Sequence, residues 1–368
     1  MEDIFNFTDD LGPEKIIHVY EPKLGLKGIV VVDNVSAGTS IGGIRMIPDI
    51  STEECFRLAR AMTLKNAAAG LKHGGGKSMI SGDSKMPLKE KEKLIRAFAQ
   101  AIKNVVEYIP GPDMGTDEIC MAWIKDEIGR SLGLPAGLGG IPLDEIGATG
   151  FGVSVSIDVA KDFCNLELKG SRAVIQGFGS VGIHSALFLA AKGVKIVGVS
   201  DTGGTLVDFD GINIESLVEF KNNGDSIIKY PKGEKRKVDD IIDIECDIWI
   251  PSARPDVVHM DNVDRLKTKL VAQGANIPIT EDAEIVLHKK GILVLPDFIA
   301  NAGGVICAAV EYSGGTQYDA FKVIEEKISK NTREVLKISN SENIPPRDVA
   351  KKLVYKRIHK MMSYRRTF

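Results

Sequence analysis

The feature that most constrains the fold of this chain is a glycine-rich turn inside residues 173–199. The order there is a short apolar strand, the turn, an apolar helix and a second strand, closed by Asp201. A lone glycine fingerprint is weak evidence, but here both strands, the helix and an acid about twenty residues on are present. The segment therefore predicts a βαβ unit of the Rossmann type. The turn has the spacing Gly-x-Gly-x-x-Gly, with glycines at Gly177, Gly179 and Gly182.

This unit predicts dinucleotide binding, because the amides at the helix N-terminus would face a pyrophosphate. Asp201 is expected to accept hydrogen bonds from the adenosine ribose, which favours NAD over NADP. Residues 202–204 (TGG) leave room and a hydroxyl donor, so NADP remains possible. The residues expected to form the cofactor-binding turn are Gly177, Phe178, Gly179, Ser180, Val181 and Gly182.

The length of 368 residues exceeds one ordinary core, so two domains are expected. Further short apolar runs at residues 248–251, 270–273 and 292–296 are separated by turns or helical pieces. A parallel sheet with crossovers requires that arrangement, so the fold class is α/β with a doubly wound dinucleotide-binding domain. Residues 133–150 are rich in glycine and proline and mark a hinge or boundary.

Composition and charge exclude several classes of protein. The chain is 43% apolar and 26% charged with a net charge of −3, which indicates a globular protein with no nucleic-acid partner. The five cysteines include no Cys-x-x-Cys pair and the six histidines show no ligand spacing, so neither disulfides nor a metal site are expected. No secretory signal is visible, and no apolar run reaches the ~20 residues that cross a bilayer. We expect a cytoplasmic protein with no membrane partner.

A second constrained stretch is residues 62–82, MTLKNAAAGLKHGGGKSMISG. It carries Lys65 and Lys77, and three glycines precede Lys77. A glycine run lets the backbone turn tightly and approach a ligand, so Lys77 is expected to point at a bound group. A nucleotide P-loop is disfavoured, because Leu71 stands where that motif requires glycine.

Caps and prolines indicate the elements around these lysines. Ser51 opens a capping box, so a helix is expected to begin there and end near Gly70. Lys65 would lie near its C-terminus, where the helix dipole also favours an ordinary surface lysine. Residues 89–108 have the pattern of a second amphipathic helix. Residues 109–113 contain two prolines and predict a rigid extended loop, whose final aspartate could equally be a simple turn former.

Four stretches of the chain carry motifs, and the motifs stand in one family's order and spacing. They are residues 42–46 (GGIRM), 62–82, 112–116 (PDMGT) and 296–305 (PDFIANAGGV). Together they resemble the amino-acid dehydrogenases of the glutamate, leucine, phenylalanine and valine family, from about Gly28 to Glu311. The resemblance implies an NAD(P)-dependent oxidoreductase that forms homo-oligomers. It also implies an N-terminal α/β substrate domain (1–143), a Rossmann domain (144–329) and C-terminal helices (330–368) that return to the first domain.

The resemblance implies roles for individual residues. Lys77 matches the catalytic lysine that activates a water, and Asp113 matches the aspartate that exchanges a proton with the departing amine. Lys65 matches the lysine that holds the α-carboxylate, with Gly42 and Gly43 as backbone contacts. Two lysines close together disfavour each other's charge, which suits a base. The implied reaction converts an L-amino acid to its 2-oxo acid and ammonia. Matching residues on the cofactor side are Thr149, Asn276 and Asn301.

The expected side-chain pocket departs from the glutamate members of that family. Ile41 stands where they carry a lysine, and Ala308 where they carry a serine. With Gly111 and Val305, these residues would leave a substrate carboxylate unpaired. A roomy pocket for an apolar amino acid such as leucine, valine or phenylalanine is therefore expected. Two alternatives remain open, namely a glutamate dehydrogenase with an atypical pocket and a catalytically idle relative that binds nucleotide.

Overall fold

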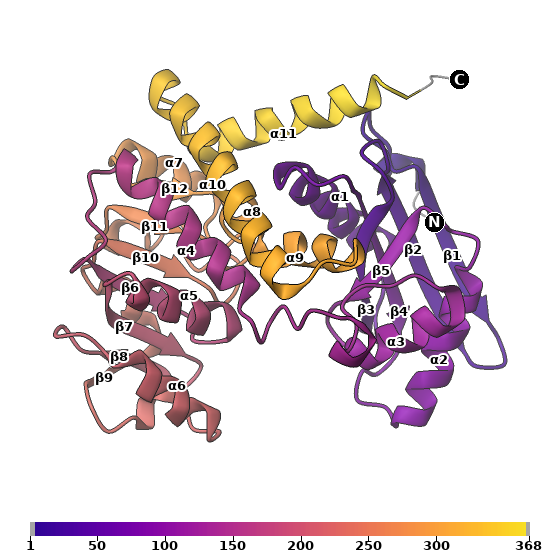
Figure 1. Ribbon diagram of the computed structural model, residues 1–368, viewed down its shortest axis with the longest axis horizontal. Helices are drawn as coiled ribbons and strands as arrows, with labels where there is room; N and C mark the ends of the chain where they lie inside the picture. Colours follow the sequence, from indigo (N-terminus) through magenta and orange to yellow (C-terminus); the bar gives the residue numbers. More distant parts are fainter. Residues whose placement is uncertain (1–3, 366–368) are drawn as a thin grey trace. The chain divides into compact units, whose positions relative to one another are not determined.

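The computed structural model describes residues 4–365, which form two compact units (Figure 1). The first unit comprises residues 4–142, 305–320 and 352–365, and the second comprises residues 143–304 and 321–351. The chain first passes from one unit to the other after residue 142, one residue before the predicted end of the N-terminal domain. The predicted return at residue 330 differs from this division, because residues 321–351 belong to the second unit.

The first unit is built on a five-stranded sheet of order β1-β2-β4-β3-β5. β3 runs parallel to β4 and β5, whereas β2 runs antiparallel to β1 and β4. Helices cover both faces, and one apolar cluster lies on each. The strands are β1 (Lys15–Glu21), β2 (Leu26–Asn34), β3 (Ser40–Ile47), β4 (Gly74–Ser81) and β5 (Tyr108–Pro112). The helices are α1 (Thr52–Ala68), α2 (Leu88–Ala101), α3 (Glu118–Ile128) and most of α9 (Gly303–Tyr312).

The glycine run before Lys77 lies in the extended strand β4, so the expected tight turn is wrong. None of the three glycines has a positive φ. A Cβ added at Gly75 would lie 2.0 Å from the backbone nitrogen of Thr63, and one at Gly76 would lie 2.8 Å from the Tyr108 ring. The glycines therefore let helix α1 and the Tyr108 side chain pack directly against the strand.

Two further predictions in the first unit need correction. The helix expected over residues 89–108 ends at Ala101, and Arg130 donates hydrogen bonds to the carbonyls of Ile102 and Val105 just beyond it. The loop expected at residues 109–113 is mostly the strand β5. Its two prolines are tolerated because β5 lies at the edge of the sheet, where fewer ladder hydrogen bonds are needed.

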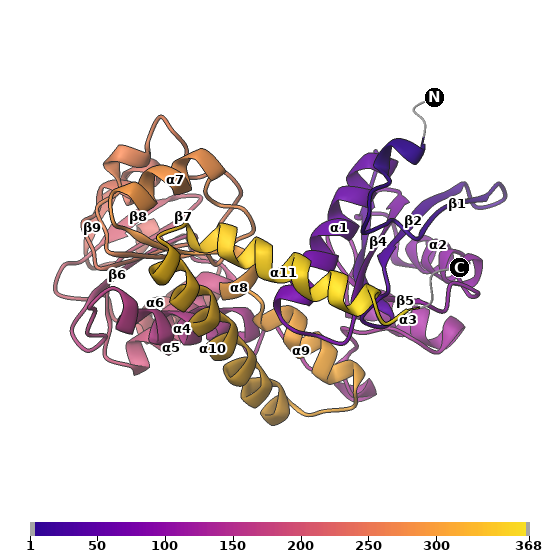
Figure 2. The same ribbon diagram turned by 90° about the horizontal axis from the view of Figure 1, so that it is seen from above.

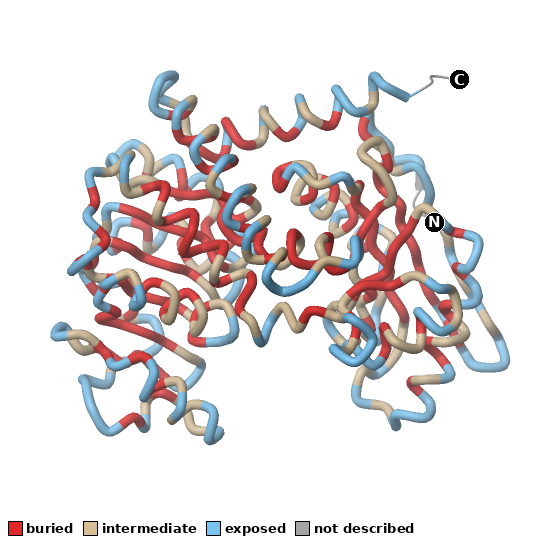
Figure 3. The backbone as a smooth tube through the Cα atoms, viewed as in Figure 1, coloured by how far each residue is buried: buried red, intermediate tan, exposed pale blue. Residues whose placement is uncertain are grey.

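The second unit contains a seven-stranded sheet of order β12-β11-β10-β6-β7-β8-β9. Its first five strands in this order are parallel to one another. β8 runs antiparallel to β7, and β9 runs antiparallel to β8. Buried clusters cover both faces, and Figure 3 shows the central strands as mostly buried and many residues of the outer helices as exposed. This is the doubly wound α/β fold that the sequence predicts. The strands are β6 (Arg172–Gln176), β7 (Lys195–Asp201), β8 (Gly204–Val207), β9 (Glu234–Arg236), β10 (Ile248–Pro251), β11 (Leu270–Ala272) and β12 (Leu293–Leu295).

Helices of the second unit lie on both faces of this sheet. In Figures 1 and 2, α10 runs alongside α4, and Gly152 of α4 leaves no room for a Cβ beside Ile328 of α10. Among residues 4–365, no helix is long and apolar enough to cross a membrane. The helices are α4 (Ala148–Ala160), α5 (Ser180–Ala191), α6 (Ile214–Asn222), α7 (Glu281–Lys289), α8 (Asp297–Ala300), and the parts of α10 (Gln317–Glu342) and α11 (Pro346–Met362) within residues 321–351.

Candidate active site

Three neighbouring strands of the first unit bring the predicted catalytic residues to one face of the sheet. In the parallel pairing, Ile41 lies opposite Gly75 and Ile109, and Gly43 lies opposite Gly111. Residues two apart in a strand share a face, so this register aligns their side chains. Helix α1 packs on the same face. The face carries Ile41, Gly43 and Arg45 from β3, Gly75 and Lys77 from β4, and Ile109, Gly111 and Asp113 from β5 and its end.

Lys77 and Asp113 form an ion pair on this face. Lys77 Nζ lies 2.6 Å from Asp113 Oδ2, and Arg45 Nε donates to the same oxygen at 3.1 Å. Arg45 also donates to Glu54 of α1 at 2.9 Å. The Lys77 side chain is 8% exposed and that of Asp113 is 24% exposed, so a small molecule can reach the carboxylate. Sequence reasoning considered Arg45 of the GGIRM motif only as a cation that could reach the side-chain pocket, and did not predict its contact with Asp113.

The charge of Asp113 follows from these neighbours. Burial raises the pKa of Asp113, but the charge and hydrogen bond of Lys77, the amide of Met114 and the charge of Arg45 together bring the pKa below its usual value. The carboxyl group is therefore ionised at neutral pH. It can accept a proton and hold Lys77 in place.

The segment after β5 fixes the position of Asp113. The Thr116 hydroxyl accepts from the Asp113 amide at 3.0 Å and donates to the Ile44 carbonyl at 2.8 Å. Gly43 leaves the space that the carboxylate needs, since a Cβ there would lie 2.7 Å from the Asp113 Cβ. Gly42 is equally restricted, because its Cβ would overlap the Gly76 carbonyl. These contacts explain why two glycines stand at this point of β3.

Lys65 lies in the last turn of α1, as the capping box predicts, and is partly buried. The helix is held on the sheet by Asp33, which accepts from Arg60 Nε at 2.8 Å and from the Thr63 hydroxyl at 2.5 Å. Thr63 packs on Gly75, two residues before Lys77. Lys65, two residues after Thr63, is thus carried on the helix that covers the Lys77 face.

The predicted pocket residues meet in one buried cluster. Ile41 and Ala308 pack together with Ile109 and Leu132, and each is less than 9% exposed. Val305 is partly buried, one turn before Ala308 on α9. The four members of this cluster are all aliphatic side chains.

Leu132, which sequence reasoning missed, fills space beside Gly111 in the expected side-chain pocket. A Cβ added at Gly111 would lie 2.4 Å from Leu132 Cδ1, so the small size of Gly111 does not by itself make the pocket roomy. The loop that carries Leu132 is fixed by Glu311 of α9. Its carboxylate accepts from the amides of Gly133, Leu134 and Ile141 at 2.7, 3.1 and 2.9 Å.

In the second unit, the glycine turn lies between β6 and α5 at the carboxyl end of the parallel strands. Gly177 has a φ of +96°, and a Cβ there would meet Ala253 at 2.7 Å. A Cβ at Gly182 would lie 2.0 Å from the Gly177 carbonyl. Gly179 is the N-cap residue of α5, and apart from its chain neighbours no atom of residues 4–365 lies within 4 Å of its Cβ position. The N-terminus of α5, where a pyrophosphate would bind, therefore has space beside Gly179.

Several buried polar atoms around this turn have no hydrogen-bond partner among the residues that the structure describes. They are Gln176 Oε1, Ser252 Oγ and Asn301 Oδ1. Leaving such an atom unpaired costs about 1–3 kcal/mol, so a polar ligand or ordered water is expected there. Phe178 is buried, whereas Ser180 is exposed and donates to the Asp144 carbonyl. The space at the N-terminus of α5 and the unpaired polar atoms fit a bound dinucleotide. Val181, the remaining residue predicted in this turn, is partly buried.

The other predicted cofactor residues also lie at the carboxyl ends of these strands. Asn301 donates to the carbonyls of Gly274 and Ala275 and to Asn276 Oδ1 at 3.1 Å, which fixes the loop after β11. Thr149 lies in the first turn of α4, with its hydroxyl 3.0 Å from the position of a Cβ on Gly304. Asp201 ends β7 and is already bound by internal donors. The asparagine pair, Thr149 and Asp201 therefore all lie in the second unit, at the edge of the sheet where the parallel strands end.

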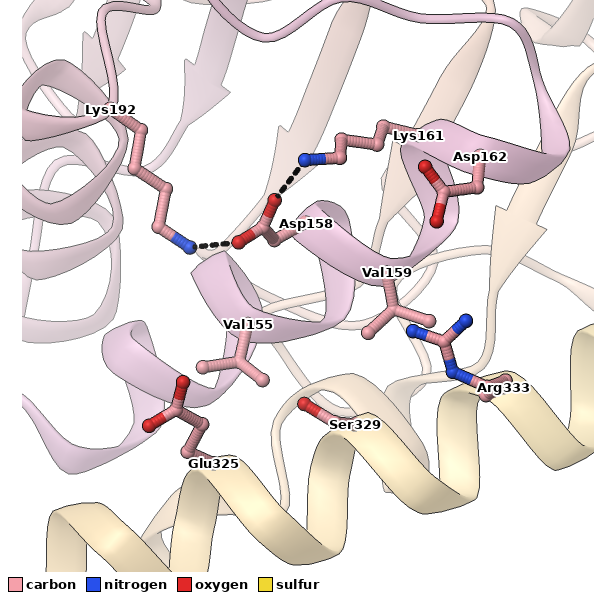
Figure 4. Close-up of a pocket in the computed structure, with 9 residues that line it drawn as sticks. All are labelled: Val155, Asp158, Val159, Lys161, Asp162, Lys192, Glu325, Ser329 and Arg333. Carbon is pink, nitrogen blue, oxygen red and sulfur yellow. Dashed lines mark hydrogen bonds and ion pairs between the residues drawn. The ribbon is translucent and has the colours of Figure 1, made fainter.

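A separate pocket of about 250 Å³ lies in the second unit (Figure 4). In it, Asp158 of α4 accepts from Lys161 and Lys192 at 2.8 and 2.9 Å. Glu325 and Arg333 of α10 line its opposite side. None of the residues predicted to act in catalysis or cofactor binding lines it. It is therefore distinct from the candidate active site.

Two family models match most of the chain. "Glutamate/Leucine/Phenylalanine/Valine dehydrogenase" matches residues 139–366, and "Glu/Leu/Phe/Val dehydrogenase, dimerisation domain" matches residues 13–130. The chain is 37% identical over 356 residues to a glutamate dehydrogenase of Aeropyrum pernix, covering 90% of this chain and 85% of that protein. It is 38% identical over 316 residues to an NADP-specific glutamate dehydrogenase of Saccharolobus shibatae, covering 80% and 74%.

Solved structures share the fold at lower identity. A hetero-hexameric glutamate dehydrogenase from Thermus thermophilus, in a leucine-bound form, matches with a TM-score of 0.85 and 24% identity, covering 97% of this chain and 91% of that chain. An L-tryptophan dehydrogenase from Nostoc punctiforme matches with a TM-score of 0.76 and 23% identity, covering 96% and 98%. Glutamate and tryptophan enzymes thus share this architecture, so the fold alone does not identify the substrate.

Proposed function

This chain belongs to the Glu/Leu/Phe/Val dehydrogenase family, and from that membership we propose that it oxidatively deaminates an apolar L-amino acid. The family consists of NAD(P)-dependent amino-acid dehydrogenases, so the chain is an oxidoreductase. The products of the proposed reversible reaction are the 2-oxo acid and ammonia. The observation that carries the proposal is the Lys77–Asp113 pair, on the same sheet face as the aliphatic cluster that contains Ile41.

In the proposed mechanism, Lys65 binds the α-carboxylate and the backbone at Gly42 and Gly43 contacts it. A nicotinamide dinucleotide held at the glycine turn would supply the acceptor for the hydride from the substrate Cα, and the substrate would then be an imine. Lys77 takes a proton from a water, and the resulting hydroxide adds to the imine carbon. The proton that Lys77 took passes through Asp113 to the departing amine. Lys77 then takes the hydroxyl proton of the adduct, and the 2-oxo acid forms as ammonia leaves. The 2.6 Å contact between Lys77 and Asp113 supports this assignment, because a proton can pass along it with little movement.

Residues of the second unit would hold the cofactor. In this proposal the amides of the turn from Gly177 to Gly182 bind the pyrophosphate. Thr149, Asn276 and Asn301 face the nicotinamide end. The unpaired Asn301 Oδ1 supports this placement, because a carboxamide donor could satisfy it.

The side-chain pocket is proposed to be apolar. A γ-carboxylate placed against Ile41 and Ala308 would have no partner within their cluster, and a buried unpaired charge costs several kcal/mol. Leu132 narrows the space beside Gly111, so an aliphatic side chain of leucine or valine size suits this cluster better than an indole. The chain would also act as a homo-oligomer, since its N-terminal part matches a model described as a dimerisation domain.

The second candidate is a glutamate dehydrogenase with an atypical pocket. The names of the similar proteins from Aeropyrum pernix and Saccharolobus shibatae favour it. Steady-state kcat/KM for leucine, valine, phenylalanine, tryptophan and glutamate separates the two. A preference for leucine or valine is expected. A preference for glutamate would overturn the apolar assignment. The absence of turnover with any amino acid would favour the third alternative, a protein that binds nucleotide but catalyses no reaction.

A further inference from the structure

The carboxylate of Asp201 is fully occupied by donors from its own unit. Oδ1 accepts from the Gly203 amide at 2.8 Å and from the Ser226 hydroxyl at 2.9 Å. Oδ2 accepts from Lys221 Nζ at 3.0 Å and from the Ile227 amide at 3.1 Å. A carboxylate offers about four lone-pair positions, so a ribose hydroxyl would have to displace one of these donors.

The charge of Asp201 is also compensated. Its side chain is 10% exposed and its ion pair with Lys221 is the closest charge contact it makes. A bare acid at this position would repel a 2′-phosphate, but an acid paired with an ammonium group at 3.0 Å presents almost no net charge. The general rule that an acid after the second strand selects NAD therefore does not transfer to this chain.

Lys221 has the properties of an anion-binding group. It lies in the last turn of α6 with a quarter of its side chain exposed. An ammonium group has three N–H donors, and Asp201 takes one of them. Two cations further along the same segment are engaged elsewhere, since Lys229 pairs with Asp225 and Arg236 pairs with Glu234. Lys221 therefore has donors to spare at the end of β7.

We propose that Lys221, oriented by Asp201, binds the 2′-phosphate of NADP and decides the cofactor preference of this enzyme. Asp201 is then a positioning residue that holds Lys221 and the segment around Ser226, and the enzyme binds NADPH at least as tightly as NADH. This inference rests on the proposed placement of the dinucleotide at the glycine turn between β6 and α5.

Direct titration of the purified enzyme with NADPH and NADH, followed by nucleotide fluorescence without amino acid, tests the proposal. The main variant is Lys221→Gln, because glutamine keeps a donor for Asp201 and removes the charge. It should weaken NADPH binding at least tenfold and NADH binding less than threefold. Lys221→Met should do the same, and circular dichroism and Tm report whether either variant is folded. Lys229→Met removes an equal charge from a 68% exposed side chain and should change neither affinity more than twofold.

A second control separates this inference from the placement of the cofactor. Ser180→Asp sets a negative charge at the exposed start of α5 and should weaken NADH and NADPH equally. If Ser180→Asp changed neither affinity, the placement itself would be wrong. If Ser180→Asp weakened both but Lys221→Gln left the NADPH to NADH ratio unchanged, the role of Lys221 alone would be overturned. A wild-type enzyme that bound NADH far more tightly than NADPH would overturn it as well.

Discussion

Lys77 Nζ lies 2.6 Å from Asp113 Oδ2, and Arg45 Nε donates to the same oxygen at 3.1 Å. The three groups come from β4, the end of β5 and β3, and parallel pairing of these strands brings them together. A buried lysine and a partly exposed carboxylate in direct contact form a short proton path that ends at the surface.

Replacing Lys77 with alanine should remove most turnover, because the variant lacks the amine that is proposed to take the proton from the attacking water. Loss of a general base lowers kcat by about 10²- to 10⁴-fold. NADH binding should persist, since the glycine turn belongs to the other unit. Stopped-flow or steady-state kcat measures the effect, with the exposed Lys85→Ala as the matched control. A kcat close to wild type would refute the assignment of Lys77 as the base.

Lys65→Ala should act mainly on KM for the amino acid. The lysine is proposed to bind the α-carboxylate, and one charge-assisted contact contributes about 1.5–3 kcal/mol. That range corresponds to a rise of roughly 10- to 150-fold in KM, provided that substrate dissociates faster than it reacts. Some loss of kcat is compatible with this role because the two lysines are coupled. An unchanged KM would show that Lys65 is not the carboxylate anchor.

Arg45→Met should change the pH profile rather than abolish activity. Burial raises the pKa of Asp113 while Lys77 and Arg45 lower it, so removing the guanidinium raises the pKa of the carboxyl group. The acid limb of the kcat/KM profile should therefore move to higher pH, because kcat/KM reports the free enzyme. Arg45→Lys keeps the charge and should move it less. An acid limb at the wild-type position in Arg45→Met would remove Arg45 from this role.

Ile41→Lys combined with Ala308→Ser should shift preference towards glutamate. The new ammonium group would sit in a cluster with Ile109 and Leu132 and would be costly to bury without a partner. The variant should therefore be less stable than wild type, and 2-oxoglutarate should restore part of the lost Tm. The kcat/KM ratio of glutamate to leucine should rise at least tenfold. A lower Tm that 2-oxoglutarate does not raise would place the side-chain pocket elsewhere.

Leu132→Ala is a smaller test of the same cluster. Truncation should enlarge the space beside Gly111 and improve phenylalanine relative to valine, at a stability cost of about 2–5 kcal/mol. Rates for both amino acids at matched temperature measure the change.

Asp201→Asn should make stability less dependent on pH in acid. Although burial raises the pKa of Asp201, Lys221, the amides of Gly203 and Ile227, and Ser226 lower it below the usual value. A carboxyl group with a depressed native pKa stabilises the fold above its unfolded pKa, and this stabilisation is lost as pH falls through the native value. The urea midpoint of wild type should exceed that of Asp201→Asn at pH 6, and the gap should close below about pH 3.9. A gap independent of pH would mean that Asp201 is not ionised in the folded protein.

The sequence by itself determined the local features of this protein. The glycine turn from Gly177 to Gly182 and its flanking strands were predicted because strand, turn and helix propensities depend mainly on adjacent residues. The capping box at Ser51 likewise located α1, and its Ser51 hydroxyl accepts from the Glu54 amide. Motif spacing was enough to identify the family, which the family models confirm.

Tertiary structure decided which side chains meet. The glycines before Lys77 predicted a turn, yet they form a strand because Thr63 and Tyr108 pack against them from elsewhere in the chain. Lys221 of α6 and Ser226 after it donate hydrogen bonds to Asp201. No local sequence pattern predicts that Lys221 compensates the charge of Asp201. Leu132 closes the space that Gly111 leaves open for the same reason. Secondary-structure propensity depends on adjacent residues, whereas burial, charge pairing and pocket size depend on contacts between residues far apart in sequence.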